Sequence, residues 1–73
     1  MEDKLFNHFM MKGMLNDFTD NQVEKFRFSC KKAVHENPQL DFNDLLKACR
    51  IYLGFIRDFP ECDLGDIVTS AQP

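Results

Sequence analysis

The chain has 73 residues and a net charge of −3, with a pI of about 5.2. This acidic balance argues against non-specific binding to nucleic acid or to anionic membranes as the main role, although it does not exclude a local basic face. A chain this short forms one domain with a thin core, burying about 60% of the surface that its unfolded form exposes. Its eight Phe and four Met supply large apolar side chains, for the core or for a partner.

The cysteines and the start of the chain predict a cytoplasmic protein that does not bind membranes. Cys30, Cys49 and Cys62 are odd in number and widely spaced, whereas a disulfide framework typically has an even count. Free thiols are typical of a reducing compartment. The chain starts with acidic residues, which is untypical of a signal peptide. No apolar run approaches the roughly 20 residues that a membrane-spanning helix needs.

Apolar residues spaced three and four apart predict a first helix over residues 2–17, as in the steps from Phe6 to Met10 and on to Met14. Gly13 lies inside this segment, where it costs about 1 kcal/mol relative to alanine. Two interpretations stay open for this glycine. It either permits the close approach of another helix or marks a kink or a fraying point.

The second helix is predicted over residues 20–36. Thr19 or Asp20 can cap its start, and Gln22 or Glu24 is within reach for a capping box. A proline two residues after this segment disfavours helical geometry in the residue before it, so the helix ends there.

The third helix is predicted over residues 41–58, between Asp41 as its N-cap and Pro60 beyond its end. It is apolar around most of its circumference, and such a helix must be covered on more than one side. We therefore expect it to lie at the centre, in contact with the other two helices. Its flank at Ile51 and Phe55 would meet the tail or a second chain.

The fourth segment, residues 62–69, shows a weaker helical pattern. Cys62 or Asp63 can cap it, and Gly65 weakens the prediction. No segment alternates with the period of two that a strand requires. The sequence as a whole predicts a small all-α domain of three helices with a short C-terminal turn or helix.

No metal site, cofactor or catalytic centre is predicted. The residue types that could bind a metal are not arranged in the close pairs that preset two ligands on one element. Cys30 and His35 could be a nucleophile and its base, but five residues along a helix they point about 140° apart. Burial would also make that thiol inert. The metal candidates considered are His8, Cys30, His35, Cys49 and Cys62.

Nucleic-acid binding is the alternative function. The second and third helices could form a helix-turn-helix in which Lys47, Arg50 and Arg57 face the groove. However, the third helix is too apolar to lie open, and its connection contains proline where such turns usually contain glycine. A small, dimeric transcriptional regulator that binds nucleic acid therefore remains the alternative, with nucleic acid as the less favoured partner.

Phe28 lies off the apolar face of the second helix, in a basic setting made by Lys25, Arg27, Lys31 and Lys32. An exposed aromatic ring among cations can stack on a nucleic-acid base or dock into an acidic protein partner. Both interpretations stay open at this point.

The leading prediction is a non-enzymatic protein-interaction module. The first helix carries more Phe and Met than one face of a helix needs, and Met-rich surface can repack around varied partners. Such a module would bind a protein partner or its own copy as a homodimer, as a stand-alone regulator or inhibitor of a larger protein machine. The predicted partner-binding residues are Phe6, Met10, Met14, Phe28, Lys25 and Lys32.

Overall fold

The computed structural model describes residues 2–71, with side chains placed over residues 3–68. Within this part of the chain the protein is an all-α domain without strands, as the sequence predicts. Among the described residues, no helix has the length and apolarity needed to cross a membrane. The helices are α1 (Glu2–Met11), α2 (Asp20–Glu36), α3 (Phe42–Ile56) and α4 (Leu64–Ala71).

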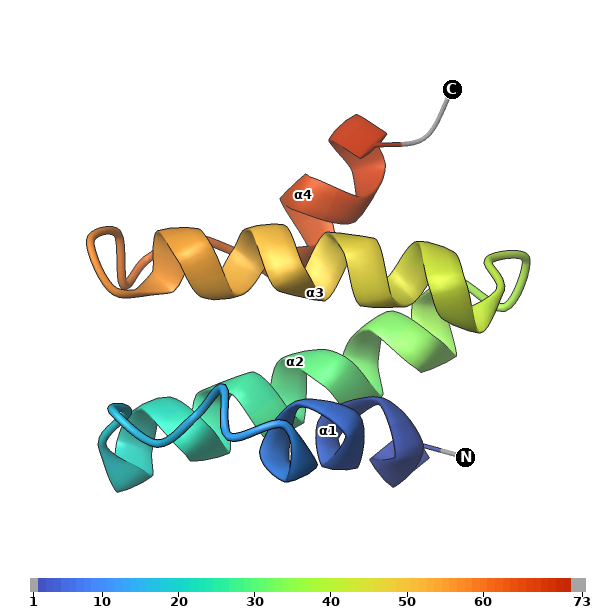
Figure 1. Ribbon diagram of the computed structural model, residues 1–73. Coiled ribbons are helices and arrows are strands. Elements are labelled where there is room, and N and C mark those ends of the chain that lie inside the picture. Colours follow the sequence, from blue (N-terminus) through green and yellow to red (C-terminus); the bar gives the residue numbers. More distant parts are fainter. Residues whose placement is uncertain (1, 72–73) are drawn as a thin grey trace.

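The helices α1 and α2 pack against each other, and α3 lies alongside this pair (Figure 1). The last helix, α4, packs on α3 and also touches α2. Since α3 contacts all three other helices, its predicted central position is confirmed, but α2 contacts all three as well. The largest fully buried side chains are Phe9, Phe26 and Tyr52, one from each of the first three helices. The core therefore lies where these helices meet.

The predicted N-cap of α3 is confirmed, and of the two candidates for α2 the structure shows Thr19, with Gln22 as its capping-box partner. Thr19 accepts a hydrogen bond from the Gln22 backbone N–H at 3.2 Å, and the Gln22 side chain accepts one from the Thr19 N–H at 2.9 Å. This reciprocal pair is the capping box. Asp41 accepts from the Asp44 N–H at 2.8 Å at the start of α3. Each cap satisfies donors that a helix start leaves without partners inside the helix.

The prediction of a first helix over residues 2–17 is too long, because Gly13 ends it. The φ angle of Gly13 is +71°, in the left-handed region that favours glycine. The Met14 N–H donates to the Phe9 carbonyl and the Gly13 N–H donates to the Met10 carbonyl, both at 3.1 Å. These two bonds form a Schellman motif, which terminates a helix. The residues after this motif form turns that connect to α2.

The third helix is also shorter than the predicted range 41–58. It ends at Ile56, since the ring of Pro60 would clash with the Ile56 carbonyl if the helix continued. The chain leaves through a turn in which the Phe59 N–H donates to the Phe55 carbonyl at 2.8 Å. Phe59 therefore lies beyond the end of α3, and its side chain is exposed.

The fourth segment is a regular helix from Leu64 to Ala71, shifted from the predicted range 62–69. Asp63 caps it by accepting a hydrogen bond from the Gly65 N–H at 3.0 Å. Leu64 and Val68 are fully buried, so α4 belongs to the core of the domain.

Candidate interaction surface

Phe28 is the most exposed aromatic side chain described, with 69% of its surface open to solvent. It lies on α2, whose opposite side carries the buried residues Phe26, Cys30 and Ala33. These three positions form the helical stripe that faces α1 and α3, and Phe28 lies off that stripe as the sequence predicts. The core therefore does not use this ring.

Four cationic side chains lie close to Phe28 in the sequence of α2, and two of them interact with other groups of the protein. Lys25 donates through Nζ to the Pro60 carbonyl. Arg27 Nε lies 3.7 Å from Asp3 Oδ1. The other two, Lys31 and Lys32, form no ion pair with any side chain of residues 3–68.

Shallow hollows adjoin Phe28 on two sides. One of about 250 Å³ lies over α2 alone. The other, of about 270 Å³, extends from α2 to α3 and to the connection between α3 and α4. The first is lined by Glu24, Arg27, Phe28 and Lys31. The second is lined by Lys25, Phe28, Ser29, Lys32, Tyr52, Glu61, Cys62 and Asp63. We call Phe28 with Lys25, Lys31 and Lys32 the Phe28 surface.

Tyr52 of α3 lines the second hollow. Its hydroxyl lies 3.4 Å from Ser29 Oγ, within hydrogen-bond distance. Burial raises the pKa of Tyr52, and the hydrogen bond with Ser29 acts in the opposite direction. The ring stays neutral at physiological pH, so this part of the hollow offers an uncharged hydroxyl.

The prediction that Phe6 lies on the binding surface is wrong. Only 8% of this side chain is exposed, and its ring packs 6.1 Å from that of Phe26. The Arg27 guanidinium covers it at 5.8 Å from the ring centre. The predicted Phe and Met surface is therefore smaller than expected. On α1, Met10 is about half exposed and Met11 is 88% exposed.

The basic strip proposed for nucleic acid is partly neutralised. Arg57 forms an ion pair with Asp17, at 2.9 Å between Nη2 and Oδ2. Its guanidinium also lies 5.2 Å from the centre of the Phe18 ring. Lys47 and Arg50 are exposed and form no ion pair within residues 3–68. The charge of this strip is thus concentrated at one end.

Two of the cysteines form a buried pair that the sequence did not predict. Cys30 Sγ and Cys49 Sγ lie 4.0 Å apart, and both residues are fully buried. The hydrogen bond with Cys49 and burial raise the pKa of the Cys30 thiol far above its ordinary value. The sequence could not reveal this pair, because spacing within one helix does not tell which residue of another helix lies opposite. Within the described residues no three His, Cys, Asp or Glu side chains gather as metal ligands would.

The burial of these thiols predicts unequal reactivity. In the native protein we expect a disulfide reagent such as dithiobis(nitrobenzoate) to react with Cys62, which is partly exposed, while Cys30 and Cys49 react only after unfolding in guanidinium. The measurement is the absorbance of the released thiolate over time. Changing Cys62→Ser should remove the fast phase. Equal rates for all three thiols in the native state would contradict the buried pair.

Comparisons with protein-family models, with curated proteins and with solved structures find no match to this chain. Function is therefore inferred from the geometry of the chain itself.

Sequence reasoning identified Phe28 and its lysines but missed a hollow at Gly54, where Met14 reaches α3 from the connection between α1 and α2. The one signal for it was a glycine in the middle of a strongly apolar helix.

Proposed function

We propose that the protein is a non-enzymatic interaction module that regulates or inhibits a larger protein machine. It would act by docking the Phe28 surface into a partner. The observation that carries this proposal is the exposed ring of Phe28 on α2, beside two lysines that form no ion pair with the side chains of residues 3–68. The half-exposed Met10 on α1 is a secondary contact in this proposal.

The energetics of interfaces support the choice of Phe28. Full burial of a Phe side chain contributes about 1.5–3 kcal/mol. Interface hot spots are few, are often aromatic, and lie at the centre of contacts that exclude water. Hollows adjoining Phe28 would let a partner approach the ring closely on two sides.

Charge selects the kind of partner that we propose. Lys31 and Lys32 place positive charge beside the ring in a chain whose net charge is −3. A complementary partner is a protein surface with an apolar groove rimmed by carboxylates, because opposite charges speed encounter and fix orientation. Glu61 and Asp63 also line the second hollow. They would repel carboxylates of the partner there and so fix how the partner is oriented on the Phe28 surface.

The geometry favours this function over nucleic-acid binding. A groove-reading helix needs several free cations on one face. In the strip Lys47, Arg50 and Arg57, the last is already paired with Asp17. Helix α3 is moreover packed against three other helices, which leaves little of it free to enter a groove.

A matched pair of variants tests the proposal. Tagged wild-type protein, Phe28→Ala and Met11→Ala would each be used to capture proteins from extract of the source organism, at low and high salt. Met11 is more exposed than Phe28 and lies on α1, so it is not flanked by Lys31 and Lys32 of α2. We expect an acidic partner that Phe28→Ala loses by about 10-fold or more, a hot-spot effect, and that Met11→Ala keeps. High salt should weaken this capture through screening.

Three outcomes would contradict the proposal. The first is an identical set of captured proteins for the wild type and Phe28→Ala. The second is a dimer in solution that Phe28→Ala converts to a monomer, which would assign the surface to a second copy of the chain. The third is tight, salt-sensitive binding of the wild type to random duplex DNA, which would favour the alternative function.

A further inference from the structure

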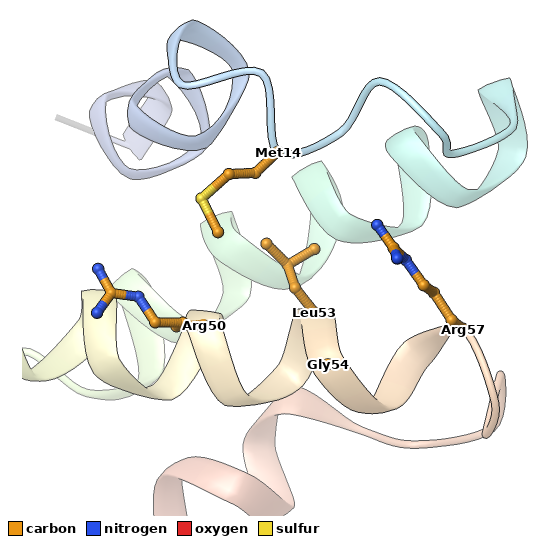
Figure 2. A pocket seen from close by; sticks show the side chains of 5 residues that line it. All are labelled: Met14, Arg50, Leu53, Gly54 and Arg57. Atoms are coloured by element: carbon orange, nitrogen blue, oxygen red, sulfur yellow. The ribbon is translucent and has the colours of Figure 1, made fainter.

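A third hollow, away from the Phe28 surface, lies between α3 and the connection that joins α1 to α2. Figure 2 shows Met14 extending from that connection toward α3, with Leu53 pointing into the same space. Arg50 and Arg57 extend from α3 at the two ends. The hollow has a volume of about 270 Å³ and is open to solvent. Its lining residues, which we call the Gly54 hollow, are Met14, Arg50, Leu53, Gly54 and Arg57.

The glycine at its floor is not required by packing. Gly54 lies inside α3 in ordinary helical geometry, where glycine costs about 1 kcal/mol relative to alanine. A Cβ atom added to Gly54 would meet no atom within 4 Å. By contrast, Gly13 is required by its positive φ angle. What the missing side chain of Gly54 does provide is open space on the surface of α3, beside Met14 and Leu53, of which Leu53 is only 7% exposed.

The two arginines differ in how much charge they offer. Arg57 is paired with Asp17 and packed over Phe18, so its charge is largely satisfied. Arg50 forms no ion pair within residues 3–68, and neither does Lys47 one turn before it on α3. An incoming carboxylate is therefore attracted to the Arg50 end of the hollow, and the apolar floor lies next to it.

We propose that the Gly54 hollow is a docking site for an acidic peptide segment of a partner protein. An apolar side chain of the segment lies over Gly54, against Met14 and the exposed edge of Leu53, and a neighbouring carboxylate pairs with Arg50. The shape supports a peptide as the occupant. Sites for small molecules enclose most of the ligand surface, whereas an open hollow accepts a side chain presented from a larger surface. The site is independent of the Phe28 surface.

The probe for the test is a short capped peptide in which leucine is followed by glutamate. It is titrated into isotopically labelled protein and followed by NMR. We expect weak binding, with Kd on the order of 1 mM, and shifts centred on the amides of Arg50, Leu53 and Gly54. A matched peptide with glutamine in place of glutamate should bind several-fold more weakly. One with glycine in place of leucine should not bind.

Variants of the hollow separate its two contributions. Gly54→Leu points into open space and fills the floor, so we expect it to keep the helical circular dichroism and to abolish peptide binding. Arg50→Gln should remove the preference for glutamate over glutamine. Phe28→Ala, away from the hollow, should bind the peptide like the wild type, which keeps this site distinct from the proposed function.

Several results would overturn the assignment. They are the absence of shifts at Arg50, Leu53 and Gly54, unchanged binding by Gly54→Leu, and shifts that appear instead at Lys31 and Lys32. Hexanoate provides a further arm, because it joins an apolar chain to a carboxylate without a peptide. If it binds this hollow more tightly than the peptide, the site belongs to small carboxylates.

Discussion

Replacing Phe26 with alanine should lower the free energy of unfolding by about 3–5 kcal/mol, the typical cost of truncating a buried Phe. Phe26 is fully buried on α2 and joins three helices. Its ring lies 5.5 Å from that of Phe9 in an edge-to-face arrangement and 6.1 Å from that of Tyr52 in a stacked one. Native proteins are stable by only about 5–15 kcal/mol, so this loss would remove a large fraction of the free energy of unfolding.

Phe28 supplies the matched control for this experiment, because it is the same residue type on the same helix. Its ring is exposed, so Phe28→Ala should change the stability by no more than about 0.5 kcal/mol. The measurement is urea unfolding of both variants and the wild type, followed by circular dichroism. If Phe26→Ala lost less than about 1 kcal/mol, well below the range for buried Phe, Phe26 could not be at the centre of the core.

Changing Gly13→Ala should destabilise the protein by about 1–2 kcal/mol, the cost of left-handed geometry for a residue with a Cβ atom. Gly13 has φ of +71° and forms the Schellman motif at the end of α1. The added Cβ would also lie 3.2 Å from the Asn16 amide nitrogen, so that side chain must shift. Loss of the motif would loosen the connection that places Met14 over α3.

Gly54→Ala is the opposite case within the same chain. It should stabilise the protein by about 1 kcal/mol, since alanine is the better helix former and the site is open. For a domain of this size, each 1 kcal/mol corresponds to about 4–8 °C in melting temperature. Thermal unfolding of the two variants should therefore give shifts of opposite sign. Shifts in the same direction would show that the two glycines are not in these two conformations.

The local features of the fold could be predicted because they depend on neighbouring residues. Both caps act over three residues, so the sequence alone identified Asp41 and narrowed the α2 cap to Thr19 or Asp20. The ends of helices were harder to predict. Gly13 had two interpretations, and only its backbone conformation decides between them. Pro60 acts four residues back, at Ile56, which places the end of α3 earlier than the proline itself suggests.

The binding surface was only partly predictable, because burial depends on contacts between distant segments. Phe28 could be recognised, since all of its apolar neighbours on α2 lie on another face. Phe6 could not, because spacing on α1 does not reveal that Phe26 and Arg27 of α2 cover it. The Gly54 hollow was likewise hidden, since it forms only where the connection after α1 meets α3.

Photo-crosslinking from position 28 tests the central claim most directly, namely that the Phe28 surface binds a partner protein. A benzophenone side chain would be placed at Phe28 in one protein and at Met11 in another, in the cells from which the chain comes. Both positions are exposed, so both variants should fold. We predict that position 28 crosslinks to a separate protein with an acidic surface and that position 11 does not. Identical crosslinks from both positions, or crosslinks only between copies of the chain, would contradict it.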